Sequence, residues 1–372
     1  MKVIKEDGMK VPIKSWCSEI EPIALEQAKH VASLPFAFHH VSLMPDCHGG
    51  YGCPIGTVAV LENTIIPHLV GVDIGCGMRA VKTEYKVTDV NIKELWKYIW
   101  NKIPTGTEKN SIRTELISIP TRLNEFHENA EYQIGTLGGG NHFIELQSDE
   151  HGILWIMIHS GSRNLGYKVA NYWNGVAKEL NQKYWSSVTS ELDLAFLPNG
   201  TDEFSQYIAE MEYCLEYARI NREYIMSSIL NYGIKAEWKY DIHHNYVRLE
   251  NHFGTNVWVH RKGATSAKLD EIGIIPGSQG TSSYIVRGLG NPESFMSCSH
   301  GAGRVMSRTK AKETLSLVNE QKLMEGILHE INSIEKLDEA PSSYKNIDVV
   351  MEEQADLVEI ITKLSPLAVI KG

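Results

Sequence analysis

"ILWIMIHSGSRN", residues 153–164, joins six consecutive apolar residues to a polar loop of small residues. A short apolar run that stops at Ser and Gly is typical of a buried strand ending in a loop. The same pattern recurs where "NVWV" runs into "HRKGAT" and where "IGTVAVL" follows "MPDCHGGYGCP". Rigid strands that present polar loops are the arrangement expected of a catalytic site.

The middle of the chain has a different periodicity. Ile208, Met211, Leu215 and Ala218 recur at helical spacing, and residues from about 165 to 235 are therefore predicted to be mainly helical. The strand and helix signals alternate too irregularly for a Rossmann fold or a TIM barrel. We predict an α+β fold: a single domain over residues 1–372 with a mixed β core that presents loops, into which the helical segment is inserted.

Composition limits the class of protein. The chain has 372 residues, 42% hydrophobic and 22% charged, as in soluble globular proteins. It contains no run of eighteen apolar residues and no apolar N-terminal segment, so a cytoplasmic protein without a membrane partner is expected. The net charge of −10 argues against a generic nucleic-acid binder, although Arg261-Lys262 and residues 304–312 are local basic spots.

Several potential metal ligands share one local pattern, a position on a glycine-rich loop or at a strand end. "GVDIGCGM" holds a carboxylate and a thiol three residues apart, "GGGNHF" holds a histidine after three glycines, and "DIHHNYV" holds two adjacent histidines, of which alternation directs only one to a site. Together they predict a metal site, with a binuclear site bridged by the thiolate as one form. The residues are Asp73, Cys76, His142, His159 and His243 or His244. Thiolate and imidazole ligands favour Zn²⁺ and leave Mn²⁺ open.

Two further stretches suggest phosphate chemistry. "IIPGSQGTSSY" offers backbone N–H groups and hydroxyls that suit either a nucleotide phosphate or a plain hairpin turn. The chain lacks a Walker loop. "SCSHGAGRVMSR" places His300 among small residues, with no apolar face to fill and no charge beside it in the sequence. His300 is thus a candidate turn residue, metal ligand, base or nucleophile.

The ordered set of motifs resembles the RtcB family of GTP- and manganese-dependent RNA ligases. The set extends from about residue 40 to Gly372 and comprises "MPDCHGGYGCPIG", "GVDIGCGM", "GGGNHF", "HSGSR", "HHNYV", "HRKGA", "PGSQG", "SHGAGRVMSR" and the terminal "KG". The resemblance implies an RtcB-like ligase domain that joins RNA 3′-phosphate or 2′,3′-cyclic phosphate ends to 5′-hydroxyl ends. The reaction would pass through a histidine–GMP intermediate and an activated RNA-ppG end, in RNA repair or tRNA splicing, with or without an activating protein of the archease type.

The resemblance also implies roles for individual residues. Cys76 would be shared by two Mn²⁺ ions, with His159 and His244 completing one site and Asp73 and His142 the other. His300 would be the guanylylated nucleophile. The implied guanylate pocket comprises Asn141, Asn245, Ser278, Ser283, His300, Ala302, Gly303, Tyr344 and Lys371. The candidates for contacts with RNA phosphates are Arg163, Arg261, Arg304 and Arg308.

Two other functions compete with RNA joining. A binuclear metal phosphoesterase would hydrolyse cyclic or terminal RNA phosphates without ligation. A metal-containing RNA-end binder with an inactive site would need neither His300 nor Lys371, and the presence of both speaks against it. A phosphoesterase and a ligase differ in that only the ligase needs the His300 nucleophile and a guanylate pocket.

Overall fold

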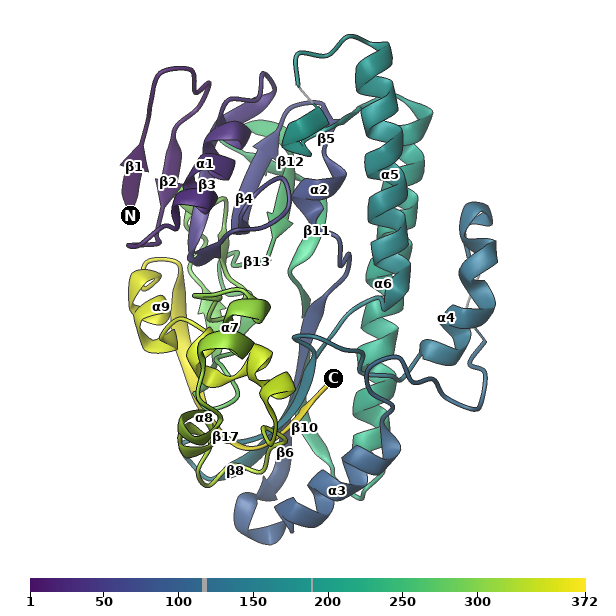
Figure 1. Ribbon diagram of the computed structural model, residues 1–372, viewed down its shortest axis with the longest axis vertical. Coiled ribbons are helices and arrows are strands. Elements are labelled where there is room, and N and C mark those ends of the chain that lie inside the picture. Colours follow the sequence, from purple (N-terminus) through teal and green to yellow (C-terminus); the bar gives the residue numbers. More distant parts are fainter. Residues whose placement is uncertain (116–118, 189) are drawn as a thin grey trace.

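Two β-sheets form the centre of the molecule in a computed structural model that describes residues 1–115, 119–188 and 190–372 (Figure 1). The six-stranded sheet has the order β1 (Lys2–Ile4), β2 (Ile13–Ser15), β3 (Ala37–His48), β4 (Ile55–Leu61), β12 (Thr255–Lys262) and β11 (Asn245–His252). The seven-stranded sheet has the order β10 (Ala236–His243), β6 (Gly77–Lys86), β8 (Ile153–Ser160), β7 (Phe143–Ser148), β17 (Val358–Lys371), β15 (Ser283–Gly288) and β14 (Ile272–Ile275). Neighbouring strands are antiparallel except β2 and β3.

The apolar run at residues 153–158 forms most of β8, inside the seven-stranded sheet. Successive side chains of a strand point to opposite faces of the sheet. Accordingly, Ile156 and Ile158 pack with residues of α3 (Ile92–Lys102) and α6 (Asp202–Leu230), whereas Trp155 and Met157 pack on the other face. Because both faces are covered, the strand is apolar at consecutive positions instead of alternating.

Two long helices, α5 (Asn164–Lys183) and α6, lie side by side along one side of the molecule (Figure 1). They occupy most of the stretch predicted to be helical, within which residue 189 lies outside the described part of the chain. Thr201 caps α6 by accepting a hydrogen bond from the Phe204 N–H group, which satisfies one free donor of the first turn. Helix α6 also packs against β6 and β8 and so supports the strands that carry the site.

Shorter elements complete the α+β fold, and the predicted fold class is confirmed. They include α1 (Pro22–Ala32), which covers β3, and α2 (Pro67–Val70), which packs on β12. The remaining short elements are β5 (Thr64–Ile65), α4 (His127–Gln133), β9 (Leu197–Pro198), β13 (Ala264–Ser266), β16 (Ser297–Ser299), α7 (Arg308–Thr314), α8 (Leu317–Leu323) and α9 (Ile347–Glu353). Among the described residues, no helix combines the length and the apolar character needed to cross a membrane.

Candidate active site with two metal-ligand groups

Four neighbouring strands of the seven-stranded sheet each place a potential metal ligand at one of their ends, and these ends lie on the same side of the sheet. Cys76 directly precedes β6, His142 directly precedes β7, His159 lies near the end of β8, and His244 directly follows β10. The strands are adjacent in the order β10-β6-β8-β7, and each pair is antiparallel. The starts of β6 and β7 therefore meet the ends of β10 and β8. Antiparallel pairing thus brings together ligands from four distant parts of the chain.

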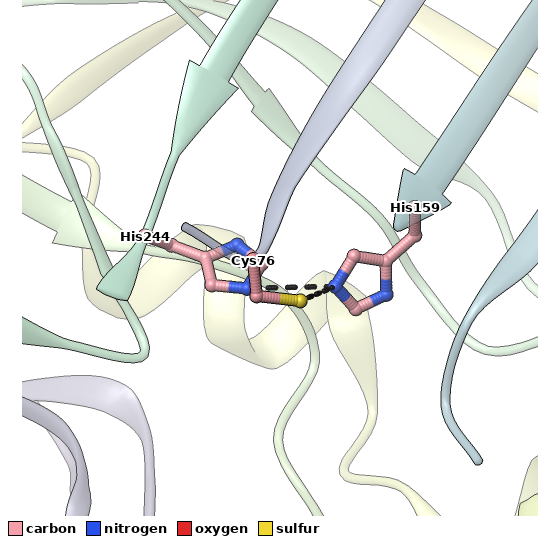
Figure 2. A group of neighbouring side chains, drawn as sticks. All are labelled: Cys76, His159 and His244. Atoms are coloured by element: carbon pink, nitrogen blue, oxygen red, sulfur yellow. Dashed lines mark hydrogen bonds between the residues drawn. The ribbon is translucent and has the colours of Figure 1, made fainter. Parts of the chain in front are cut away.

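Cys76 belongs to two groups of potential ligands. One group joins it to His159 and His244, and the other joins it to Asp73 and His142. Its Sγ lies 3.1 Å from His159 Nε2 and 3.5 Å from His142 Nε2. Figure 2 shows the first group, in which His159 Nε2 also lies 3.4 Å from His244 Nε2. The ligand atoms of each group lie within 4.8 Å of one another, so one sulfur atom can serve two neighbouring ions.

The protons of two imidazoles are directed away from these groups. His142 Nδ1 donates to the Leu137 carbonyl at 3.0 Å, and His159 Nδ1 donates to the Asn141 carbonyl at 3.2 Å. A carbonyl can only accept, so each Nε2 keeps its lone pair for a ligand. Burial, followed by the nearby His142 and His300, lowers the pKa of His159 and keeps its ring neutral. The tautomers therefore suit metal coordination.

The thiol of the site depends on a cation for its charge, whereas the carboxylate does not. Burial raises the pKa of the Cys76 thiol, and the neighbouring Asp73 raises it further. A divalent cation reverses this local field and stabilises the thiolate that binds it. Burial opposes ionisation of Asp73, but the neighbouring His142, whose Nε2 lies 3.3 Å from Asp73 Oδ2, lowers its pKa. The thiol, carboxylate and imidazole donors thus fit two divalent cations.

The adjacent His243 and His244 have different surroundings. His244 belongs to the first ligand group, whereas His243 Nδ1 lies 3.1 Å from the Gly75 carbonyl and 3.3 Å from Arg222 Nη2. Successive side chains along a strand point to opposite faces, so the ring of His243, the last residue of β10, and the ring of the following His244 point to different sides. Only His244 therefore lies with the ligands.

His300 is held by a buried carboxylate, Asp46, that is absent from the predicted site. His300 Nδ1 lies 2.6 Å from Asp46 Oδ2, and the same oxygen accepts the His300 backbone N–H at 3.2 Å. The side chain of Asp46, in β3, is fully buried, and that of His300 is 16% exposed. An ionised carboxylate only accepts hydrogen bonds, so Nδ1 carries the proton and Nε2 has a free lone pair. This is the tautomer that a nucleophile needs.

Residues around Asp46 hold this arrangement in place. Lys345 Nζ donates to the carbonyls of Pro45 and Cys47, at 3.0 and 2.7 Å, on both sides of Asp46. Gly303 has a φ of +74°, and a Cβ there would lie 2.2 Å from the Asp46 carbonyl oxygen. Gly303, three residues after His300, therefore leaves room for the backbone of Asp46.

A cavity of about 790 Å³ connects the metal ligands with His300. Its size is that of a small-molecule site. Seven of the residues expected in a guanylate pocket line it besides His300, namely Asn141, Asn245, Ser278, Ala302, Gly303, Tyr344 and Lys371. Lys371 reaches the cavity because β17 pairs with β7 and sets it opposite Phe143, next to the ligand His142.

Two carboxylates in the cavity were absent from the predicted site. Glu339 lies 3.1 Å from Lys371 Nζ, also bonds Tyr344, and pairs with Arg304 and Arg308. Burial alone would raise its pKa, but Lys371 and the Tyr344 hydrogen bond lower it to about 2.

Glu145 lies on β7, and burial raises its pKa to about 8 despite the opposing charge of Lys371. The run "NHFIEL" contained a signal for it, because an acidic residue in an apolar strand needs a specific partner.

Two expectations need correction. Ser283 is fully buried and does not line the cavity, since its hydroxyl accepts from Gln147 and from the Gly277 N–H group. Arg261 is wrong as an RNA contact, because it is 0% exposed and pairs with Glu250.

Arg163 lies outside the cavity lining and donates to Thr136 and to the Gly106 carbonyl. Arg304 and Arg308 line the cavity, although both also pair with Glu339.

Two groups of potential metal ligands and a carboxylate-held histidine around one cavity fit a metal-dependent enzyme. The model of the family described as tRNA-splicing ligase RtcB matches residues 27–120 and 118–372. The chain therefore belongs to the RtcB family.

Named relatives cover nearly the whole chain. It is 39% identical to an RNA-splicing ligase RtcB1 and 38% identical to an RNA-splicing ligase RtcB, from two strains of Escherichia coli, over 97% of each chain. It is 30% identical to a tRNA-splicing ligase RtcB from Thermococcus kodakarensis, over 94% of this chain and 91% of that one.

Proposed function

We propose that the protein is an RNA ligase that joins 3′-phosphate or 2′,3′-cyclic phosphate ends to 5′-hydroxyl ends, with GTP and two Mn²⁺ ions. Family membership and the names of its relatives support RNA joining. The observation that carries the chemistry is the Asp46–His300 pair, 2.6 Å apart, in the cavity that also holds the metal ligands. A neutral imidazole with a free Nε2 is a nucleophile at neutral pH.

The first covalent step joins His300 to the nucleotide. Its Nε2 attacks the α-phosphorus of GTP, the bond from that phosphorus to the bridging oxygen breaks, and pyrophosphate leaves with the electron pair. Asp46 accepts from Nδ1–H throughout and stabilises the positive charge that the ring acquires.

The RNA 3′-phosphate then attacks the same phosphorus, the P–N bond breaks, and the RNA end carries ppG. The 5′-hydroxyl attacks the RNA phosphorus and loses its proton to water, and the bond to the bridging oxygen breaks, so that GMP leaves with the electron pair. A cyclic end must first be opened to a 3′-phosphate.

The ligand groups would bind the two cations through the shared Cys76, with His159 and His244 on one and Asp73 and His142 on the other. Bound there, divalent cations neutralise phosphate charge during each displacement. The choice of Mn²⁺ rests on the family resemblance, because sulfur and nitrogen donors alone favour Zn²⁺.

Carboxylates near Lys371 support guanine as the base. Guanine presents N–H donors on its Watson–Crick edge beside the O6 acceptor. Glu339 is an ionised acceptor in the cavity, the protonated Glu145 offers one donor and one acceptor, and Lys371, 3.1 Å from Glu339, is a donor. Adenine has an acceptor at the position of the guanine N1–H group, so this arrangement favours guanine. The expected cytoplasmic location and an activating protein partner remain predictions.

The test is a covalent adduct with GTP labelled at its α-phosphate, formed with Mn²⁺ and without RNA. We expect a labelled protein that is stable in alkali and labile in acid, as a phosphoramidate is, and unlabelled protein for His300→Ala. His151→Ala is the matched control, since His151 is exposed in the turn between β7 and β8 and does not line the cavity. It should label like the wild type.

Two results would count against the proposal. Labelling of His300→Ala, or no adduct in the wild type with Mn²⁺, would exclude His300 as the nucleophile. Release of phosphate from RNA ends without joining would instead identify the phosphoesterase.

A further inference from the structure

The loop that precedes β4 presents an exposed aromatic ring at the cavity. Tyr51 is 71% exposed and lines the cavity. Its backbone is held in place, because the Tyr51 carbonyl accepts from Cys53 N at 2.8 Å and from Lys262 Nζ. The preceding Gly50 N–H donates to Gln27 Oε1 at 3.1 Å. An aromatic side chain on a pinned loop loses little freedom when a flat group stacks on it.

Beneath the same loop lies a histidine that the proposed chemistry does not use. His68, on α2, is 7% exposed and lines the cavity. Among the described residues, neither of its ring nitrogens has a hydrogen-bond partner, and its nearest carboxylate, Asp193, lies 4.0 Å away, beyond hydrogen-bonding distance. Asp193 pairs with Lys178 at 2.5 Å. Buried polar groups are normally paired, so an unpaired imidazole that lines a cavity indicates a partner from outside the protein.

Lys262 holds Tyr51 and His68 together, and these three residues form one wall of the cavity close to His300. Its Nζ donates to the carbonyls of His68, at 3.1 Å, and of Tyr51. The next residue, Gly263, approaches the nucleophile closely, since a Cβ there would lie 3.1 Å from His300 Cε1. The wall therefore lies beside the reacting histidine and comes from different elements than Glu339, Tyr344 and Lys371.

The chemistry of this wall matches a nucleotide of RNA. A base of any identity stacks on tyrosine. Burial, followed by Lys262, lowers the pKa of His68 to about 4, so the ring is neutral and offers one donor and one acceptor. A ribose 2′-hydroxyl is both donor and acceptor and distinguishes RNA from DNA. A phosphate oxygen would satisfy only the donor.

We propose that Tyr51 and His68 form a subsite for one ribonucleotide at the junction, in which the base stacks on Tyr51 and the 2′-hydroxyl bonds His68. The inference rests on the proposed ligase function. The two strands to be joined each supply a nucleotide at the junction, so the 3′-phosphate strand and the 5′-hydroxyl strand are both sources to be tested.

The experiment compares joining of intact RNA with RNA modified at one junction nucleotide. That nucleotide is made abasic or 2′-deoxy, on the 3′-phosphate strand or on the 5′-hydroxyl strand, and kcat/KM is measured below saturation. Each variant is judged by its own ratio of intact to modified RNA, so a partly unfolded preparation does not affect the result. The wild type must lose activity with a modification on one of the two strands, which identifies the strand bound.

For the base, stacking energies predict a loss of roughly 5- to 150-fold when the wild type meets an abasic junction nucleotide. Tyr51→Ala should join intact and abasic RNA equally, and Tyr51→Phe should keep the wild-type ratio. Tyr184→Ala is the matched control, because Tyr184 is 58% exposed at the end of α5 and does not line the cavity. It should also keep the wild-type ratio.

For the sugar, the loss of a neutral hydrogen bond predicts a preference of about 2- to 12-fold for ribose over deoxyribose in the wild type. His68→Ala should abolish the preference, and His68→Gln, which keeps a donor and an acceptor, should retain part of it. Wild-type ratios in Tyr51→Ala or His68→Ala, or a wild type indifferent to both modifications on both strands, would overturn the subsite while leaving the ligase intact. A wild type that joins no RNA would contradict the proposed function itself.

Discussion

Replacing Asp46 by Asn and by Ala tests how the carboxylate prepares His300. Asp46 Oδ2 accepts from two donors, His300 Nδ1 at 2.6 Å and the His300 backbone N–H at 3.2 Å, while Oδ1 has no partner among the described residues. The backbone N–H cannot change its role, so it holds the oxygen of an Asn side chain at the Oδ2 position. Asp46→Asn therefore keeps the Nδ1–H tautomer and loses only the negative charge.

The two variants should differ in magnitude. A hydrogen bond to a charged group contributes about 1.5–3 kcal/mol and a neutral one about 0.5–1.5 kcal/mol, so the Asn variant loses roughly 1–1.5 kcal/mol, or about 5- to 12-fold in rate. Asp46→Ala removes the acceptor of both donors and frees the ring to exchange tautomers. We expect roughly 100-fold slower guanylylation for Asp46→Ala, because the lost charged bond and the unpaired donors add.

The assay is the single-turnover rate of adduct formation at saturating GTP, with thermal unfolding of each variant as the control for folding. The order wild type, Asn, Ala is the essential result. An Asn variant as slow as the Ala variant would mean that the amide turns its NH₂ group to His300, which contradicts the role given to the backbone N–H. Equal rates for all three proteins would refute the positioning role of Asp46.

Two further predictions concern the metals and the response to acid. Metal analysis of purified protein should give two Mn²⁺ per chain for the wild type, one for His142→Ala or His244→Ala, and close to none for Cys76→Ala, because only the thiolate is shared; equal losses in all three variants would contradict the sharing. Burial lowers the pKa of His260 to about 3, and its Nε2 accepts the Ile66 N–H at 3.1 Å. An unfolded histidine titrates near 6.5, so the unfolded chain binds more protons below that pH and stability falls by about 2 kcal/mol between pH 7 and pH 5 from this residue. Calorimetry should show the melting temperature dropping over this range, less steeply in His260→Gln; an equal slope in both proteins would exclude His260 as the cause.

The part of the site that could be predicted is the part encoded locally. Strand β8 was visible as an apolar run, and Cys76, His142 and His159 each stood at the end of such a run or beside glycines. Their convergence was a guess from composition and resemblance, because strand order is set by packing between segments far apart in sequence. The order β10-β6-β8-β7 supplies the physical reason.

The charged partner of His300 could not be predicted for a similar reason, because it is far away in the sequence. Asp46 and His300 are 254 residues apart, and Asp46 lay in a quoted motif without a role. The signal is a carboxylate directly after the apolar residues Leu43, Met44 and Pro45, since burial of an acid requires a partner. Arg261 was predicted to contact RNA because the sequence there is basic, but sequence indicates charge and not exposure. Its guanidinium is buried and pairs with Glu250 on the neighbouring strand.

The glycines around His300 have a role in backbone packing that the sequence motif alone does not indicate. Gly303 is required by the Asp46 carbonyl, and a Cβ at Gly263 would collide with Ile55 at 2.3 Å. Their primary effect is to let three backbone segments close around one histidine. Close packing of this kind fixes the ring before any nucleotide arrives, so the orientation of Nε2 costs no entropy in the reaction. The small residues beside His300 therefore serve preorganisation of the ring as well as space for the ligand.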